Sequence, residues 1–569
     1  MSNGTQALAI EAPVVKAKVS GEDWAMRGGL AAIGVFMLIA VGFPLYFLLS
    51  KAFENSDGDF IGLTNFVEYF STPALFYSIF NSLTIAIIST TITISLAFWF
   101  AYALTRSCMP GKPFFKMISI VPILVPSLLP GISLVYLFGN QGMIKGLMMG
   151  TPIYGAIGIV LGEVFWTFPH AMIIIVTAMS LTDARLYEAA QALRTSKLKT
   201  FFTVTLPGAK YGLISACFVV FTLVITDFGV PKVIGGQFNV LAVDVYKQVV
   251  GQQNFEMGAV VGLVLLAPAA FAFIADRIVQ RKQVAMLSAR AVPFEPKPNR
   301  WFDLTMLGFC SVVGFLLLTI LGVAAYASFV KFWPYNLSLT LDNYQFDLMD
   351  GGGWGSFYNS IEMAGWTAVI GTTIVFSGAY LVEKSKGFEQ GRSVIQLLCM
   401  IPLAVPGIVL GIAYIFFFNA LGNPLGFIYH TMIILVLCTI THFYTVSHLT
   451  ATTALKQMDA EFESVSASLK VPFYRTFLRV TVPVCLPAIL DISIYFFVNA
   501  MTTVSAVVFL YSADTALASV AMLNMDDAGD IAPAAAMGMM IFYTSATVRL
   551  IHLALTRGLL TKTQAWRKR

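Results

Sequence analysis

Two stretches of the chain determine its organisation: EAAQALR at residues 188–194 followed by FFTVTLP at 201–207, and ESVSASLK at 463–470 followed by FLRVTVP at 477–483. Both are polar and amphipathic, and each lies between two long apolar segments. Charged side chains are costly in hydrocarbon, so both stretches should lie in water beside a membrane. A loop of this kind that occurs twice is typical of a docking element for a soluble partner.

The composition indicates a membrane protein. Of the 569 residues, 57% are hydrophobic and only 11% are charged, whereas soluble domains carry about 25% charged residues. Apolar runs of about 20 residues are long enough to cross a bilayer as helices, and about twelve occur here. These predicted spans are Gly28–Leu49, Ile79–Ala103, Met117–Phe138, Ile153–Met179, Leu213–Val230, Met257–Ala275, Phe302–Val330, Ser360–Val382, Val394–Asn419, Phe427–Leu449, Pro487–Leu510 and Ile531–Leu555. We therefore expect an all-α polytopic fold.

The distribution of lysine and arginine predicts the orientation. Basic residues gather in alternate loops, which include both repeated stretches, and on the same side lie the central linker and both termini. Positive charge marks the cytoplasmic side of a membrane protein, so the repeated loops and both termini are predicted to be cytoplasmic. The net charge of +5 is then a consequence of topology, and it predicts no nucleic-acid partner.

Catalytic and metal-binding patterns are not found in the sequence. The six cysteines and five histidines are scattered, with no CxxC pair, which predicts buried apolar thiols and no metal site. The chain has no GxxxxGK[ST] phosphate loop and no polar segment large enough for a nucleotide-binding fold. We expect no cofactor and no enzymatic activity, so any ATP hydrolysis would belong to a separate subunit.

An internal duplication relates the two halves. VPILVP at 121–126 matches IPLAVP at 401–406, and the repeated loops follow at nearly the same separation, about 280 residues. Asn81 and Asn359, each followed by serine, are expected to cap equivalent spans. Because about six spans separate equivalent points, the halves should have the same orientation and form tandem parallel six-helix repeats.

The duplication also predicts the domain boundaries. A basic, proline-rich stretch between the halves indicates a cytoplasmic linker. The expected organisation is a cytoplasmic tail at 1–27, a first transmembrane domain at 28–280, the linker at 281–300, and a second transmembrane domain with a basic C-terminal tail at 301–569.

The Glu-Ala-Ala stretch with Leu-Pro nineteen residues after its glutamate resembles the EAA loop of type I ABC importer permeases. The resemblance covers residues 28 to about 560. It implies a pore-forming subunit of the bacterial inner membrane whose loops dock on a dimer of ABC ATPases. The residues that it implies in docking are Glu188, Ala189, Ala190, Leu193, Arg194, Leu206 and Pro207 in the first loop, and Glu463, Ser464, Leu469, Lys470, Val482 and Pro483 in the second.

The sequence departs from the family pattern in two places. The family usually has glycine at the turn between the two short helices of the loop, where Arg194 and Lys470 stand here. Counting back from Pro483 also places Ser464 opposite Glu188, with Glu463 displaced by one position. The second loop is therefore expected to dock less tightly or differently.

A narrower resemblance concerns the substrate. DFGVPKVIGG at 227–236 and QQNF at 252–255 are similar to putative 2-aminoethylphosphonate permeases. This resemblance implies that a periplasmic binding protein delivers a small phosphonate to the chain. Fused permeases for ferric iron and polyamines share the duplicated organisation, and these solutes are the alternatives.

Prolines and buried charges are candidates for the pathway. Pro122 and Pro126 in the first half, and Pro402 and Pro406 in the second, should bend a span, either to line the path or only to fit the packing. Asp227 is expected at an outer gate, with Thr503 as its counterpart, although a local cap or a pair with Lys232 would explain it equally well. Further buried charges, each a possible structural pair, are Glu163, His170, Asp491 and, near a helix end, Glu362.

Two other classes of function remain open. A twelve-span secondary transporter of the major facilitator type would also have parallel halves, but it does not explain the repeated loops, and no arginine-rich signature occurs at Thr105–Lys116. A channel or scaffold would leave the docking loops and bent spans without a purpose.

Overall fold

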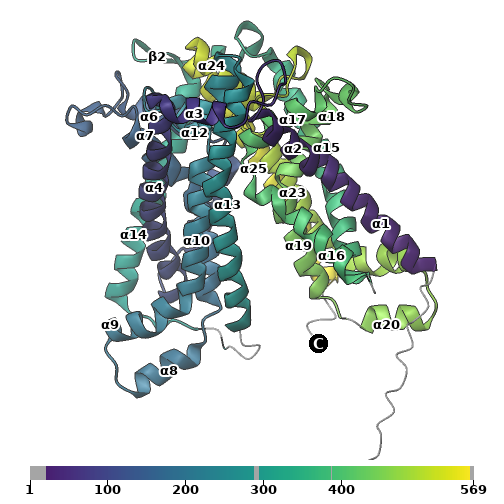
Figure 1. Ribbon diagram of the computed structural model, residues 1–569. Helices are drawn as coiled ribbons and strands as arrows, with labels where there is room; N and C mark the ends of the chain where they lie inside the picture. The colour runs from purple at the N-terminus through teal and green to yellow at the C-terminus, as the bar shows by residue number, and fades with distance from the viewer. Residues whose placement is uncertain (1–20, 287–291, 293, 386–387, 460, 564–569) are drawn as a thin grey trace, which may run out of the picture.

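The computed structural model describes residues 21–286, 292, 294–385, 388–459 and 461–563. Within these residues the chain is almost entirely helical, and its halves form two legs that join at one end and part at the other (Figure 1). We call the joined end the closed end and the parted end the coupling end, because the two repeated loops lie at the tips of the legs there.

The helices of the first half are α1 (Gly21–Met37), α2 (Phe43–Lys51), α3 (Thr64–Ser71), α4 (Pro73–Arg106), α5 (Lys112–Ile120), α6 (Leu128–Phe138), α7 (Ala156–Ser180), α8 (Ala184–Ala192), α9 (Lys197–Thr200), α10 (Leu206–Thr226), α11 (Gly229–Ile234), α12 (Leu241–Tyr246) and α13 (Phe255–Met286). The second half has α14 (Arg300–Phe329), α15 (Gly353–Lys384), α16 (Glu389–Met400), α17 (Gly407–Phe418), α18 (Met432–His442), α19 (Tyr444–Lys456), α20 (Glu461–Ser468), α21 (Phe473–Thr476), α22 (Val482–Val484), α23 (Leu486–Thr502), α24 (Ala518–Ala528) and α25 (Ile531–Thr563). A short antiparallel hairpin, β1 (Val330–Phe332) with β2 (Asn336–Leu339), follows α14.

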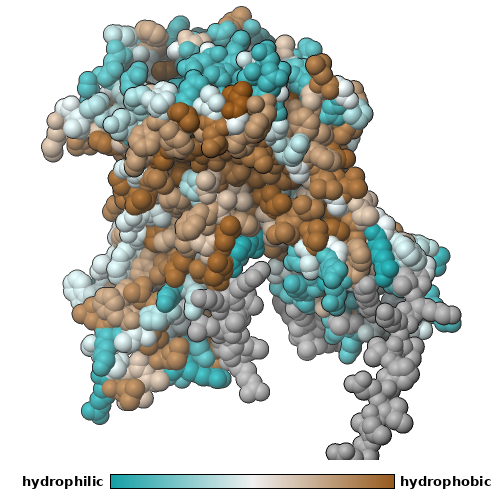
Figure 2. Space-filling view, in the orientation of Figure 1, coloured by the Kyte–Doolittle hydropathy of each residue, from teal (hydrophilic) through white to brown (hydrophobic). Residues whose placement is uncertain are grey.

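The number of spans agrees with the expected all-α polytopic fold. In the described part of the chain, 8 helices are long and apolar enough to cross a membrane, and the number is up to 12 if each of four bent helix pairs is one span. An apolar belt separates hydrophilic regions at the two ends of the molecule, as a bilayer requires (Figure 2). Three of the four bends lie inside predicted single spans, which are Met117–Phe138, Val394–Asn419 and Phe427–Leu449, whereas the fourth, between Val484 and Leu486, lies just before the predicted span Pro487–Leu510.

The first helix of each half crosses to the other half. Helices α1 and α2 pack on α15, α16 and α17, and α14 packs on α4, α5 and α6 (Figure 1). At one of these contacts the rings of Phe43 and Phe47 meet the ring of Phe417, with centroids 5.7 and 5.5 Å apart. Because each half holds a helix of the other, the fused chain can form one continuous apolar core.

The predicted caps at Asn81 and Asn359 are wrong. Helices α4 and α15 begin at Pro73 and Gly353, so both asparagines lie inside helices. The side chain of Asn81 donates to the carbonyl of Asn239 at 2.9 Å, and that of Asn359 donates to the carbonyl of Ala516 at 3.0 Å. The repeated asparagine therefore ties the second long helix of each half to a loop at the closed end.

Candidate functional site

The repeated loops fold as two matching helical hairpins at the coupling end (Figure 1). The first coupling hairpin is α8 with α9, and the second is α20 with α21. Asp183 precedes α8, and its carboxylate accepts a hydrogen bond from the backbone N–H of Arg185 at 3.1 Å. This side chain satisfies one of the amide groups that the first turn of a helix leaves free. The predicted pair of short helices is thus present in both halves.

The turns of the two hairpins have the same backbone. Arg194 and Lys470 have φ angles of 50° and 53°, in the left-handed region that favours glycine. The next backbone N–H bonds back to the carbonyl of Ala190 in one hairpin and of Ser466 in the other, each at 3.0 Å. A positive φ angle at this turn explains why glycine would suit it. In this chain Arg194 and Lys470 adopt the same conformation, which is less favourable for a residue with a side chain.

Matching π-helical turns join both hairpins to the following spans. They cover Phe201–Thr205 before Pro207 and Phe477–Thr481 before Pro483. A proline has no N–H to donate and its ring clashes with the carbonyl four residues back, so the helical ladder widens before it. Leu206 and Val482 begin the helices that carry the two prolines. In the first half the helical path runs unbroken from Lys197 to Thr226, whereas in the second half it bends by 77° between Val484 and Leu486.

The hairpins present apolar side chains to solvent. Leu193 and Leu469, which occupy equivalent places beside the two turns, are 78% and 69% exposed. Leu198 and Val465 are also exposed on these hairpins. Outside the membrane, gathered apolar side chains of this kind mark a surface that another protein covers. Glu188 and Ala189 are exposed on α8, whereas Ala190 packs inward.

The structure gives Glu463 a different position from that of Glu188. The Glu463 carboxylate lies 2.6 Å from Nζ of Lys384, the last residue of α15. In the first half, Nε of Arg106, the last residue of α4, donates to the hydroxyl of Tyr187 at 3.2 Å. Glu463 is therefore the counterpart of Tyr187 and faces its own half, while exposed Ser464 is the counterpart of Glu188.

The linker adds a contact to the first hairpin. The backbone N–H of Ala184 donates to the carbonyl of Val292 at 2.9 Å. The Phe294 ring lies 4.5 Å from the Tyr187 ring, and the Arg106 guanidinium is 4.7 Å from the Phe294 ring. Part of the linker thus holds the start of the first coupling hairpin. Residues 281–286 of the predicted linker form the end of α13, and residues 287–291 and 293 lie outside the described residues.

The proline pairs break their spans sharply. The two helical parts meet at 103° in the first half and at 113° in the second. Pro122 and Pro402 lie in 3₁₀ turns, and Pro126 and Pro406 lie between these turns and α6 or α17. Two prolines four residues apart remove backbone donors on both sides of the break, which explains a bend this large.

Asp227 and Thr503 occupy the same backbone position. They directly follow α10 and α23, with φ and ψ of −70° and 134° for Asp227 and of −71° and 135° for Thr503. Both are buried. The Asp227 carboxylate accepts from the backbone N–H of Val230 at 2.8 Å, so it caps α11, and it is Asp527 that pairs with Lys232.

The bent span of each half packs against the loop that follows these residues. A Cβ on Gly229 would lie 2.1 Å from Oγ of Ser127, and a Cβ on Gly407 would lie 2.5 Å from Oγ of Ser505. In the first half the bent span provides the serine and the following loop the glycine; in the second half the bent span provides the glycine and the loop the serine. The backbone of the segment after α10 or α23 therefore lies in close contact with the bent span.

The other charged residues that the sequence placed in apolar segments have different surroundings. Glu163 is fully buried in α7, and His170 lies one to two turns further along the same helix. Asp491 was expected to be buried, but its side chain is 55% exposed; its carboxylate lies 3.4 Å from Nε2 of His552 in α25. Glu362 is exposed on α15. Sequence reasoning singled out these residues but not their partners.

An ion pair that the sequence did not predict joins the halves at the closed end. Nζ of Lys232 in α11 lies 2.9 Å from a carboxylate oxygen of Asp527 in α24, and the same ammonium lies 5.2 Å from the centre of the Tyr246 ring. The Tyr246 ring in turn stacks on Phe509 of the second half. Lys232 and Asp527 lie far apart in the sequence. Their loops were predicted to lie on the same side of the membrane, and the sequence contained no other sign that the two residues would be in contact.

The pH dependence of this contact follows from Asp526, beside Asp527. Burial, with a smaller contribution from the Asp527 carboxylate, raises the pKa of Asp526 to about 7. An acid with a raised pKa in the folded state contributes stability below its unfolded pKa, and that stability is lost as the pH rises through about 7. We expect the melting temperature of the purified protein to fall by ~1 °C or more between about pH 5 and pH 8.

Asp526→Asn should remove this part of the pH dependence, because the amide does not ionise. The melting temperatures of the two proteins, measured in parallel across the same pH range, give the test. Parallel curves for the two proteins would show that Asp526 does not titrate in this range.

Comparisons with known proteins agree with the duplication. Residues 96–284 and 385–561 match the family described as "Binding-protein-dependent transport system inner membrane component". A ferric transport system permease protein, FbpB, of Actinobacillus pleuropneumoniae is 28% identical over 555 residues, which cover 94% of this chain and 79% of that protein. A spermidine/putrescine permease protein, PotB, of Haemophilus influenzae is 24% identical and covers 44% of this chain and 94% of its own length. A solved bacterial alginate ABC transporter in complex with an alginate-bound periplasmic protein aligns with a TM-score of 0.39 and 15% identity, over 48% of this chain and 97% of that one.

Proposed function

The chain belongs to the family of binding-protein-dependent transport system inner membrane components, and from this premise we propose that its two halves enclose one ATP-driven path for a small phosphonate. It is a permease subunit of an ABC importer and not an enzyme. The observation that carries the proposal is the pair of matched coupling hairpins at the tips of two parted legs (Figure 1).

Each coupling hairpin receives one subunit of a cytoplasmic ABC ATPase dimer. The exposed leucines Leu193 and Leu469 enter apolar grooves, and Glu188 pairs with a basic residue at the rim of one groove. Both loops, both chain termini and the linker then lie in the cytoplasm, and the closed end faces the periplasmic binding protein. This assignment follows the distribution of basic residues.

ATP binding would bring the two ATPase subunits, and with them the hairpins, closer together. The first hairpin leads straight into α10, and the second leads through α22 and a 77° bend into α23; Asp227 and Thr503 directly follow α10 and α23. The rigid-body shift is therefore delivered to the loops that contact the bent spans. The closed end opens as the coupling end closes, which gives alternating access.

A direct test of the ATPase partner uses co-purification. The permease is expressed with a tagged ATPase subunit from the same transport system, and the retained ratio of the two is measured after detergent extraction. Two ATPase subunits for each permease chain are expected, since the chain has two hairpins. Purified permease without the ATPase should not exchange solute; exchange would support the secondary transporter instead.

Asp227 is proposed to meet a cationic group at the outer gate. Asp227→Asn should slow transport about tenfold without changing assembly, because the amide can still cap α11 but no longer carries a charge. Uptake in vesicles and ATPase co-purification are the two measurements. Thr503→Val, at the equivalent position, is the matched control and should have a smaller effect.

A cysteine at position 227 tests the gate from the outside. A membrane-impermeant thiol reagent should label it in one nucleotide state and not in another. If the reagent fails to label position 227 in every nucleotide state, Asp227 is only a helix cap and the gate assignment is wrong.

We propose 2-aminoethylphosphonate as the solute. The support is the resemblance of residues 227–236 and 252–255, and the position of these segments near the closed end. Gln252 and Asn254 line a cavity of about 240 Å³ together with Lys247 and Asp244. Burial raises the pKa of Asp244 to about 6. Side chains of both signs suit a solute that carries an ammonium and a phosphonate group.

Ferric iron is the second candidate, because ferric permeases match nearly the whole chain. A deletion strain that lacks other uptake routes separates the two. It should fail to grow on 2-aminoethylphosphonate as the only phosphorus source and should grow normally when iron is limiting. Growth on the phosphonate with a defect in low iron would exclude the first substrate and support the second; polyamine uptake is the third measurement.

A further inference from the structure

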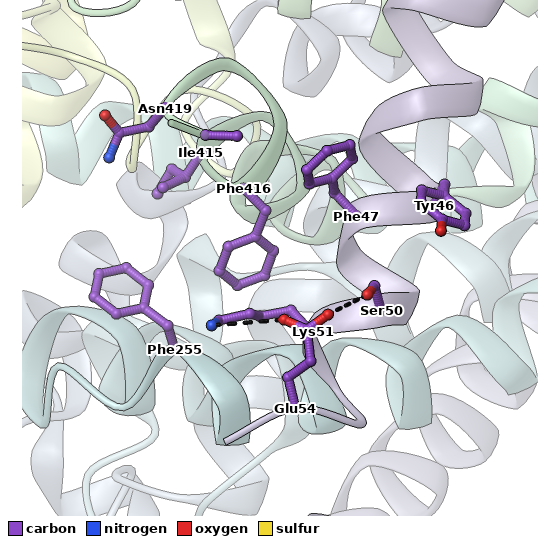
Figure 3. Close-up of a pocket in the computed structure, with 10 residues that line it drawn as sticks. Tyr46, Phe47, Ser50, Lys51, Glu54, Phe255, Ile415, Phe416 and Asn419 are labelled. Carbon is purple, nitrogen blue, oxygen red and sulfur yellow. Dashed lines mark hydrogen bonds and ion pairs between the residues drawn. The ribbon is translucent and has the colours of Figure 1, made fainter. Parts of the chain in front are cut away.

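A cavity lies at a seam between the two halves, near the end of the first span. It has a volume of about 410 Å³ and lies among α2 and α13 of the first half and α17 of the second (Figure 3). Most of its wall is aromatic or aliphatic, and its polar groups gather at one side. The lining residues are Tyr46, Phe47, Ser50, Lys51, Glu54, Phe255, Ile415, Phe416, Asn419 and Ala420.

The polar side of this cavity carries both signs of charge. Nζ of Lys51 lies 3.3 Å from a carboxylate oxygen of Glu256 and 3.8 Å from one of Glu54. The hydroxyl of Ser50 donates to the other oxygen of Glu54. Each of the three charged side chains is about a fifth to a quarter exposed, so the group is accessible to a ligand. One cation and two carboxylates leave one negative charge in excess.

The apolar wall continues from this charged group along the span. Figure 3 shows the Lys51 side chain running past the ring of Phe416, with Phe47 and Tyr46 one to two turns further along α2. Tyr46 is 63% exposed on the outside of the molecule. Lys51 ends the first candidate span, so the charges lie at the level of lipid headgroups and the aromatic wall lies in the hydrocarbon region.

The equivalent seam in the other half is filled by the chain itself. Tyr136 follows Pro122 by as many residues as Phe416 follows Pro402, and Trp333 packs on Tyr136 with ring centroids 5.9 Å apart. The indole N–H of Trp333 donates to the carbonyl of Gln141 at 3.0 Å. The β1–β2 hairpin that brings Trp333 there follows α14, the counterpart of α1 and α2.

The charges are also specific to one seam. Asn65 donates to the carbonyls of Ala52 and Glu54, and Asn343 donates in the same way to those of Ser328 and Val330. This match makes Ala327 the counterpart of Lys51, and Val330 that of Glu54. The duplicated fold therefore leaves one seam open and charged, and closes the other with apolar side chains.

We propose that the open seam binds one phospholipid with an ethanolamine headgroup, in the leaflet at the closed end. The third N–H of Lys51, beyond those directed at Glu54 and Glu256, donates to the lipid phosphate. The excess negative charge of the two glutamates binds the lipid ammonium, and one acyl chain lies along Phe47 and Phe416. The lipid would bridge α2 of the first half and α17 of the second, so it would stabilise the contact between the halves.

Native mass spectrometry of the purified, delipidated permease tests this site. Phosphatidylethanolamine, phosphatidylcholine and phosphatidylglycerol with identical acyl chains are added in turn. One phosphatidylethanolamine should be retained at least about tenfold more strongly than either of the other two lipids. The trimethylammonium group of phosphatidylcholine has no N–H to donate, and the glycerol headgroup of phosphatidylglycerol has no positive charge. Equal retention of the three lipids would mean that the seam holds only unselected bilayer lipid and would overturn the proposal.

Three variants show whether the retained lipid lies in this seam. Lys51→Ala should reduce retention at least about tenfold, while Lys331→Ala, an exposed lysine paired with Asp342, should leave it unchanged. Ala420→Phe should also reduce retention, by filling the cavity without removing a charge. Unchanged retention in both Lys51→Ala and Ala420→Phe would contradict the site, and displacement by soluble phosphoethanolamine at low concentration would show that the ligand is a free solute and not a lipid.

Discussion

Replacement of Glu188 by lysine is expected to reduce transport at least about 100-fold and to weaken ATPase association about as strongly, because juxtaposed like charges cost several kcal/mol at a protein interface. Glu188 is exposed on α8, so the substitution should not disturb membrane insertion. The measurements are uptake in whole cells, the amount of permease in the membrane and the ATPase retained on purification.

Glu463 is the matched control for this experiment. It carries the same side chain in the second hairpin, but its carboxylate is held 2.6 Å from Lys384 within the same half. Glu463→Gln should therefore weaken the attachment of α20 to α15 and reduce transport only several-fold. If Glu188→Lys and Glu463→Gln both left ATPase association unchanged, the assignment of the hairpins to docking would be wrong.

The positions of Glu188 and Glu463 show which features of the hairpins could be predicted from the sequence. Local features were predictable: charge, proline positions and the repeated spacing indicated two helical loops, and the departure from glycine at Arg194 and Lys470 marked a turn that has a positive φ in both. The counting that placed Ser464 opposite Glu188 agrees with the exposed positions of both residues. These inferences succeed because a short hairpin depends mainly on its own residues.

Properties that depend on packing between distant segments could not be predicted. The proline pairs indicated bends, but angles of 103° and 113° depend on what α6 and α17 pack against. Asn81 was expected to begin a helix, yet α4 starts at Pro73 and the amide of Asn81 bonds to a loop of the same half. The packing of α1 and α14 on the opposite halves could not be predicted from hydrophobic periodicity. In a membrane helix the sides that face lipid and the sides that face protein are both apolar.

Exchange of the charges between Lys232 and Asp527 should give the second large effect. Lys232→Asp places a third carboxylate beside Asp526 and Asp527 and removes the ammonium from the Tyr246 ring, so the closed end should open. We expect ATP hydrolysis without the binding protein to rise several-fold, and transport to fall at least about tenfold, because an importer whose outer gate stays open no longer alternates between its two states.

The double variant Lys232→Asp with Asp527→Lys restores one cation and one carboxylate across the same gap, 2.9 Å in the native pair. If the ion pair holds the two halves together, the double variant should recover most of the transport that each single variant loses. The interaction free energy from the double-mutant cycle should then be large. Lys232 is 20% exposed and Asp527 is 44% exposed, so the native pair alone contributes little stability; the expected effect comes from repulsion among the carboxylates when the lysine is replaced. Additive losses in the double variant would mean that the two residues act separately, and the halves would then be held at the closed end by Tyr246 and Phe509.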